Sequence, residues 1–211
     1  QAAAIGGEAD QIPQDMESEE AFAAFIGQVR DGDYEKEEPW YRWSVEVKEV
    51  KKEKIEENLK KRYDSNSKLV LTLDGEEFIS QPIKKVGTIT DIYCAKRLPG
   101  GVMDELVIVT DQNTFKVISE NTIRYVLNDG VSKVLRQDGS EVASPNILPS
   151  AFMIIDTVKK NGSVIGYKLS GGGYGHGVGM SQNGARAMGV QGFTCEEILD
   201  CFYQACEIKS V

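Results

Sequence analysis

A glycine-rich stretch over residues 171–192, with the sequence GGGYGHGVGMSQNGARAMGVQG, constrains the fold more than any other part of the chain. Six of the nine residues from 171 to 179 are glycine, and the single histidine, His176, lies among them. Glycine loses more backbone freedom on folding than any other residue. We therefore expect the run to occur where φ must be positive or where another surface approaches the backbone, as in a ligand groove.

The residues after these glycines predict the N-terminus of a helix. Ser181 is a candidate N-cap, and the small residues that follow it allow a helix to pack closely. The free N–H groups and positive dipole end of such a helix favour oxygen-rich or anionic ligands. The candidate substrate-binding residues are Tyr174, His176, Ser181 and Gln182. The spacing is equally compatible with a glycine-rich strand-to-helix crossover that contains a satisfied, buried histidine.

The glycines do not form a dinucleotide-binding motif. Gly173, Gly175 and Gly177 alternate instead of following the GxGxxG spacing, and no acidic residue follows at the distance that a ribose would require. The four cysteines lack CxxC spacing, which argues against a zinc ribbon. Cys195, Cys201 and Cys206 are expected to be buried on one helix. We predict no metal and no cofactor.

Length and charge limit the remaining classes of function. A chain of 211 residues suits one domain, or one domain with an additional lobe. The net charge of −9 argues against a nucleic-acid surface and against electrostatic adhesion to anionic membranes, but it is compatible with a glycan ligand. No apolar stretch approaches the roughly 20 residues of a membrane span, and no signal region opens the sequence.

Hydrophobic periodicity and turn residues predict an α+β fold of mainly antiparallel strands with a few helices. Asn161-Gly162 favours a hairpin turn, and the strand after it leads into the glycine-rich loop and then the C-terminal helices. Thr194 and Glu197 form a predicted capping box. Helices are expected near 18–30, 50–63, 119–127 and after 194, and strands near 41–47, 69–73, 86–95, 105–110, 113–118, 131–136, 151–158 and 164–169.

The charged run 33–38 is interpreted as a solvated linker, although acidic clusters can also form sites. Val29 is assigned to the apolar stripe of the first helix, and Tyr41 and Trp43 to the buried face of a strand. Aromatic residues at this strand start are expected to belong to the core, with sugar stacking as the alternative. The proposed organisation is a helical and linker segment over 1–38 and a domain over 39–211.

The segment GYGHGVGMSQNGARAM, followed by EEILDCFYQACEI, resembles the C-terminal signature of the stage II sporulation protein D (SpoIID/LytB) family. LPSAF at 148–152 and TIR at 122–124 are similar to the segment that precedes this signature. The resemblance covers the C-terminal half of the chain well and the earlier half weakly.

The resemblance implies an extracytoplasmic protein of the cell envelope that acts on peptidoglycan. Members are lytic transglycosylases, in which one glutamate serves as general acid and base, or enhancers of a cell-wall amidase. The motif of that glutamate, LPxEV followed by KAQAVAARTYA, is absent from the sequence, as is the zinc-binding Cys and His cluster of some members. Neither Glu105 nor Glu197 inherits the role, so the catalytic residues stay unassigned and whether the chain is an enzyme stays open.

The favoured expectation is recognition of peptidoglycan glycan strands as part of a sporulation-linked lytic transglycosylase, with this chain corresponding to the C-terminal portion of the domain. The alternative is a non-catalytic, LytB-like module that binds cell wall and enhances an amidase. A cell-wall amidase or other sporulation proteins would then be further partners. A third possibility is a structural domain whose glycine loop only makes a crossover.

Overall fold

A computed structural model of the chain describes residues 15–144, 146–203, 206–207 and 209. Within these residues the fold is α+β, with two antiparallel five-stranded sheets and five helices, which confirms the predicted class. The helices are α1 (Glu19–Ile26), α2 (Lys52–Ser65), α3 (Glu120–Val126), α4 (Gln182–Val190) and α5 (Cys195–Phe202).

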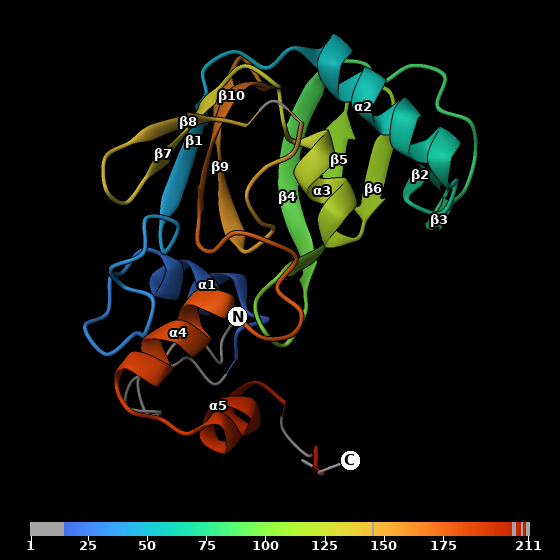
Figure 1. Cartoon of the computed structure of the whole chain (residues 1–211). Helices are drawn as coiled ribbons and strands as arrows, with labels where there is room; N and C mark the ends of the chain where they lie inside the picture. Colours follow the sequence, from blue (N-terminus) through green and yellow to red (C-terminus); the bar gives the residue numbers. More distant parts are fainter. Residues whose placement is uncertain (1–14, 145, 204–205, 208, 210–211) are drawn as a thin grey trace.

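The first sheet has the order β8-β7-β1-β10-β9, and the second has the order β3-β2-β6-β5-β4. The first sheet contains β1 (Trp43–Val47), β7 (Lys133–Arg136), β8 (Glu141–Ala143), β9 (Met153–Lys160) and β10 (Ser163–Gly171). The second contains β2 (Val70–Asp74), β3 (Glu77–Ile79), β4 (Ile89–Arg97), β5 (Met103–Thr110) and β6 (Thr114–Ile118). The sheets meet where β4 contacts β9 and β10, while α2 and α3 pack on the second sheet (Figure 1).

The strand that begins at Trp43 shows the predicted alternation. Trp43, Val45 and Val47 are each only 3% exposed, because β1 lies between β7 and β10 with one face in the core. The β9–β10 hairpin turns at Asn161 and Gly162, whose φ values of 51° and 78° confirm the predicted turn conformation. β10 then leads directly into the glycine-rich loop.

Helix α1 is fastened to the sheets by packing and by a buried guanidinium group. The Phe22 ring lies edge-on to Phe152 with centroids 4.8 Å apart. Arg97 on β4 donates to both carboxylate oxygens of Glu19, at 2.7 and 2.8 Å, and its side chain is 1% exposed. The helix ends at Ile26, so the assignment of Val29 to its apolar stripe is wrong, and Val29 is 62% exposed.

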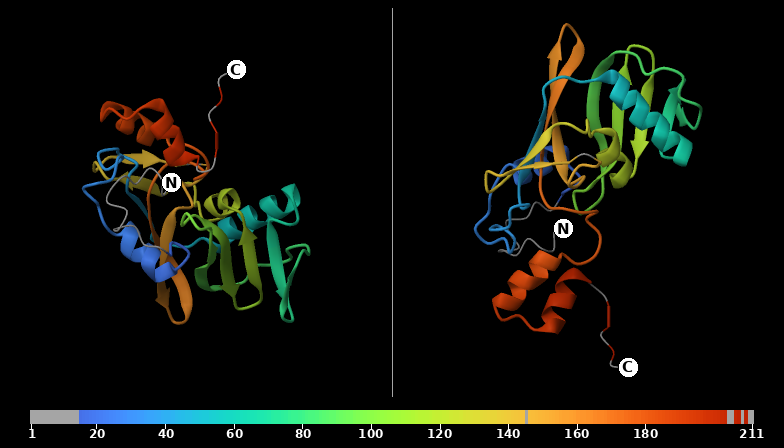
Figure 2. Two further views of the ribbon diagram at one scale, coloured as in Figure 1. Left: turned by 90° about the horizontal axis from the view of Figure 1, so that it is seen from below. Right: turned by 45° about the horizontal axis from the view of Figure 1, so that its top comes forward.

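Other predictions fail where tertiary context decides. The run 33–38 is not a solvated linker, because Asp33 is 4% exposed and accepts a hydrogen bond from the Tyr41 hydroxyl. Cys195 and Cys206 are exposed instead of buried, since α5 ends at Phe202 and buries none of its residues against the described chain. Figure 2 shows α4 and α5 at one end of the molecule, away from the second sheet.

Candidate functional site

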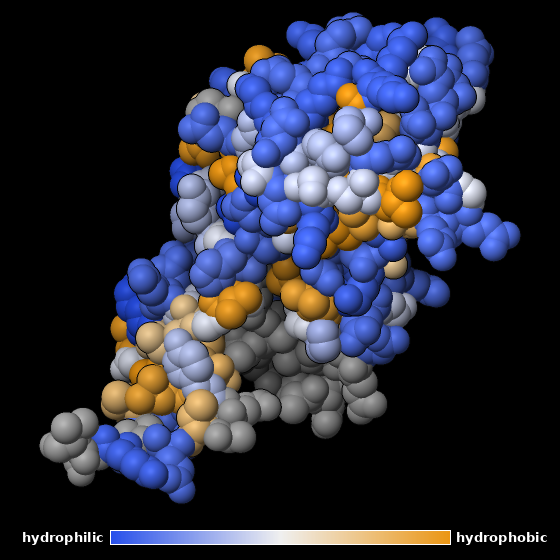
Figure 3. Space-filling model, turned by 90° about the vertical axis from the view of Figure 1, so that its right-hand side faces the viewer, coloured by the Kyte–Doolittle hydropathy of each residue, from blue (hydrophilic) through white to orange (hydrophobic). Residues whose placement is uncertain are grey.

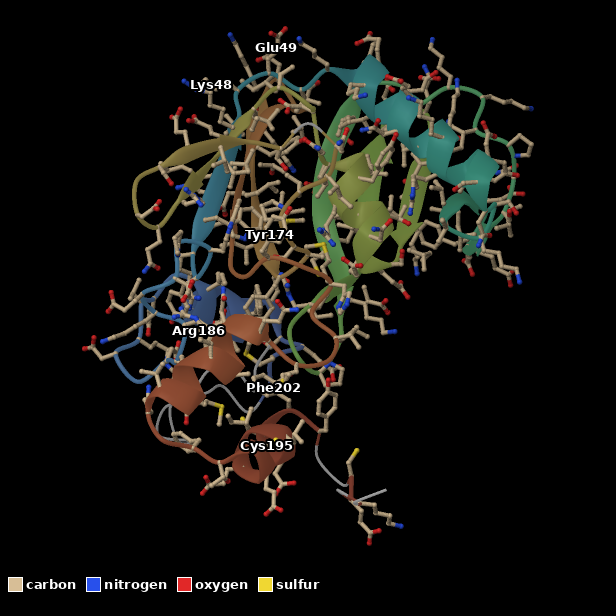
Figure 4. The ribbon with its side chains drawn as sticks, viewed as in Figure 1. Lys48, Glu49, Tyr174, Arg186, Cys195 and Phe202 are labelled. Carbon is tan, nitrogen blue, oxygen red and sulfur yellow. The ribbon has the colours of Figure 1, made fainter. Side chains whose placement is uncertain are left out.

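A cleft of about 460 Å³ lies where the glycine-rich loop meets the segment that precedes β1 and the first turn of α4. Its walls contain all four predicted binding residues, Tyr174, His176, Ser181 and Gln182. The other lining residues are Glu35, Trp40, Tyr41, Arg42, Phe152, Asn183 and the remaining residues of 172–180. Figure 4 labels Tyr174 between the lower ends of the strands and α4, which carries Arg186.

Backbone geometry explains the glycines of this loop. Gly173, Gly175, Gly177 and Gly179 have φ values of 72°, 133°, 78° and 79°, which confirms the expectation of positive φ. At Gly171 the second expectation holds, because a Cβ atom there would lie 2.4 Å from the Trp43 ring. The glycine-rich loop therefore contributes mainly backbone to the wall of the cleft.

Hydrogen bonds hold the loop on the first sheet. The N–H of Gly173 donates to the Trp40 carbonyl at 2.8 Å, and the indole N–H of Trp43 donates to the Gly173 carbonyl at 3.0 Å. The N–H of Gly175 donates to the Pro149 carbonyl at 2.9 Å. The cleft wall is therefore fixed by three hydrogen bonds to two separate segments of the chain.

His176 is exposed in the cleft, so the interpretation as a buried core histidine is wrong. Its Nδ1 accepts the N–H of Val178 at 2.9 Å. In the neutral imidazole, a ring nitrogen that accepts leaves the proton on the other nitrogen. The Nε2–H group of His176 is therefore a donor for a ligand.

Two aromatic rings form one side of the cleft. Trp40 and Tyr174 lie with centroids 4.8 Å apart and ring planes tilted by 49°, and Tyr174 is 67% exposed. Trp43, at 3% exposed, belongs to the core as expected. Tyr41 is also buried, at 5% exposed, but it precedes β1 and lines the cleft, so its assignment to the strand is wrong. Sequence reasoning did not single out Trp40, because the alternation that identified the strand starts one residue later.

Ser181 has two roles at the start of α4. Its oxygen accepts the N–H of Gly184 at 3.2 Å, which confirms the predicted N-cap. Its hydroxyl donates to the carboxylate of Glu35. Gln182, the first residue of α4, is exposed at the cleft. The helix start thus contributes one constrained and one free polar side chain.

Glu35 is the acidic side chain that lines the cleft, and no pattern in the sequence distinguishes it from its charged neighbours. Burial raises the pKa of Glu35 above its ordinary value, and the charge of Glu38 raises this pKa further. The hydrogen bond from Ser181 and the backbone N–H of Gly184 act in the opposite direction and lower the pKa. Desolvation is the largest of these effects. The cleft therefore holds a carboxyl group whose ionised form the surroundings disfavour.

The segment around Glu35 also fastens α4 to the body of the protein. Glu38 forms an ion pair with Arg186 of α4. The Tyr34 ring lies edge-on to Phe193, with centroids 5.8 Å apart. These contacts anchor the helical wall of the cleft independently of the Glu35 carboxylate.

Clusters of metal ligands and long apolar helices are both absent from the part of the chain that the structure describes. No three His, Cys, Asp or Glu side chains there gather closely enough to hold a metal ion. Among the same residues, no helix combines the length and apolar character needed to cross a bilayer. The arrangement offers hydrogen bonding and aromatic packing.

Comparisons with known proteins give a family without an assigned role. No curated protein and no solved structure matches the chain. The model of one family, described as a domain of unknown function (DUF8618), matches residues 7–179, which include the aromatic pair, Glu35 and the glycine loop as far as Gly179. The chain therefore belongs to the DUF8618 family.

Proposed function

We propose that the cleft binds glycan strands of peptidoglycan, as part of a SpoIID-like, sporulation-linked lytic transglycosylase in the cell envelope. The observation that carries this proposal is the Trp40–Tyr174 ring pair beside the backbone-lined glycine loop. A sugar ring has an apolar C–H face and a polar rim. Aromatic rings offer a large apolar surface to such a face at little cost in side-chain entropy.

The polar groups around the rings suit the rim of a sugar. His176 offers Nε2–H as a donor, and Gln182 offers an amide that both donates and accepts. The cleft volume of about 460 Å³ is within the usual range for small-ligand sites. Mainly apolar walls with a few placed polar groups are typical of such sites.

The proposal assigns binding, not bond cleavage, to these residues. The family's glutamate motif is absent from the sequence, and the cleft residues contain no segment that resembles it. No residue of the cleft is therefore assigned the role of that catalytic glutamate. Recognition of the glycan is the part that the cleft supports.

Sedimentation with insoluble peptidoglycan tests the proposal. We expect the wild-type chain to sediment with purified peptidoglycan and Tyr174→Ala to stay mostly in the supernatant, because the substitution removes the more exposed ring. Tyr93→Ala is the matched control, since Tyr93 lies on β4, is 46% exposed and does not line the cleft. Failure of the wild-type chain to sediment, or equal loss in both variants, contradicts the proposal.

A second candidate, a module that enhances a cell-wall amidase, is favoured by the apolar surface of the C-terminal helices. Val190 is 81% exposed, and α5 buries none of its residues against the described chain. Figure 3 shows hydrophobic residues gathered in the lower part of the molecule, where Figure 1 places α4 and α5. Acceleration of amidase turnover by the wild-type chain, lost in Val190→Asp, would favour this function.

A further inference from the structure

We propose that Glu35 is a ligand-binding residue of the cleft: its carboxylate accepts a hydrogen bond from a hydroxyl or amide N–H group of the bound sugar. The inference rests on the proposed function, because it assigns a binding residue to the same cleft. It also adds a binding residue that neither the sequence pattern nor the family resemblance assigned.

The contacts of Glu35 leave capacity for a ligand. Its Oε1 atom accepts the Ser181 hydroxyl, and the carboxylate also interacts with the N–H of Gly184. A carboxylate has about four lone-pair sites, so these two donors use only part of its acceptor capacity. Since Glu35 lines the cleft, the remaining capacity is available to a bound sugar.

Ser181 fixes the direction of this carboxylate. The Ser181 oxygen is held by the N–H of Gly184, which turns the hydroxyl hydrogen toward Glu35. A preorganised acceptor costs less side-chain entropy on binding than a mobile surface glutamate. The serine that caps α4 therefore also prepares the acceptor.

The fold itself does not benefit from the charge of Glu35. Burial raises the pKa of this carboxyl group, so ionisation at neutral pH costs stability relative to the unfolded chain. α4 is held independently by the Glu38–Arg186 ion pair and by packing of Tyr34 on Phe193. A disfavoured charge in a cleft is typical of a functional group, because a structural group would be selected for stability.

The charges around Glu35 indicate which ligand groups fit beside it. Glu38 raises the pKa of Glu35, and Arg186 is engaged by Glu38. Arg42, which lines the cleft, donates to the carbonyls of Phe25, Gln28 and Tyr41. His176 lies in the same cleft with Nε2–H as its donor, and Tyr34 is the neighbouring phenol. A ligand carboxylate or phosphate beside Glu35 would be repelled, whereas hydroxyl and amide N–H donors are attracted.

Calorimetric titration with the tetramer of N-acetylglucosamine at pH 7 tests the inference. Hydrogen bonds to charged groups are stronger than neutral ones, so Glu35→Gln is expected to weaken binding about tenfold, which corresponds to about 1.4 kcal/mol. Glu37→Gln is the matched control, because the Glu37 side chain is 90% exposed and does not line the cleft. The control is expected to bind like the wild type.

Each outcome decides between the proposals. If the wild-type chain binds the tetramer and Glu35→Gln binds equally well, the role of Glu35 is refuted while glycan recognition stands. If the wild-type chain does not bind, glycan recognition and the role of Glu35 both fail. Thermal unfolding distinguishes a ligand-binding role of Glu35 from a structural one. At pH 7 the melting temperature of Glu35→Gln should be no lower than that of the wild type. A melting temperature lower by about 5 °C or more would make Glu35 a structural anchor.

Discussion

Replacing Gly171 by alanine tests whether the glycine loop requires close approach of a neighbouring side chain. Gly171 ends β10 opposite Trp43, and an added Cβ atom would lie 2.4, 2.7 and 2.8 Å from three atoms of the indole ring. The ring is 3% exposed, so it has no free space into which to move. We expect the ring to shift and to lose its hydrogen bond to the Gly173 carbonyl.

The expected cost follows from these contacts. Overpacking a core typically costs about 1–3 kcal/mol, and the lost hydrogen bond adds about 1 kcal/mol. Alanine restricts the unfolded chain and thereby returns about 0.4–1 kcal/mol. The free energy of unfolding of Gly171→Ala should therefore fall by about 2–3 kcal/mol.

Urea unfolding monitored by tryptophan fluorescence measures this change. With a slope of about 2 kcal/mol per molar urea, the midpoint should fall by about 1–1.5 M. Gly189→Ala is the control, because Gly189 is a helical residue whose added Cβ would come no closer than 4.0 Å to other atoms. That variant should be more stable by up to about 1 kcal/mol. An unchanged midpoint for Gly171→Ala would refute the argument that the glycine is required by the Trp43 ring.

Further predictions concern the loop, the cleft and the core. Gly175→Val should destabilise the protein by about 1–3 kcal/mol through backbone strain alone, because φ is 133° and an added Cβ meets no atom within 4 Å; a urea midpoint equal to wild type would contradict this. His176→Ala should change the free energy of unfolding by less than about 0.5 kcal/mol and weaken glycan binding about tenfold, and the affinity of His176→Gln should lie between those of the wild type and the alanine variant. A lower melting temperature of His176→Ala, with normal binding per folded molecule, would instead make His176 a structural residue. Arg97→Met should cost about 3–5 kcal/mol in urea unfolding, because buried carbonyls of Gly101 and Met153 lose their donor; a cost below about 1 kcal/mol would show that the guanidinium is dispensable. The folded-state pKa of Glu35 is raised above 4.5, so the contribution of Glu35 to stability is complete below pH 4.5 and is lost as the pH rises through the folded-state pKa. The melting temperatures of the wild type and Glu35→Gln should therefore diverge in favour of the variant as the pH rises. Parallel curves of melting temperature against pH would show that burial does not perturb this carboxyl group.

Local signals in the sequence predicted much of the secondary structure. The turn at Asn161 and Gly162, the N-cap at Ser181 and the capping box of Thr194 and Glu197 all involve chemistry within a few residues, and the structure contains each of them. Such signals are reliable because the interacting groups are neighbours in every conformation of the chain.

Short edge strands were missed for the opposite reason. β3 has three residues and ends the second sheet, and β8 has three residues and ends the first sheet. Neither buries a residue fully, so neither carries the alternation that identifies a half-buried strand. Their conformation follows from the strand beside them, which the sequence of the segment itself does not contain.

The composition of the cleft follows from one long-range pairing. β1 and β10 are antiparallel with Trp43 opposite Gly171, and continuing this register beyond the sheet places Trp40 opposite Tyr174, as their ring contact requires. The same direction of the two chains brings Glu35 to Ser181 at the start of α4.

Charge patterning alone gives Glu35 and Glu37 equal weight, although one lines the cleft and the other has a side chain that is 90% exposed. The difference between them depends on which strand pairs with β1. β1 and β10 lie far apart in the sequence, so neither segment by itself contains a signal of their pairing. A prediction that had paired the strand at 41–47 with the strand at 164–169 would have found the aromatic wall and the carboxylate together, because an antiparallel register determines which flanking residues face each other.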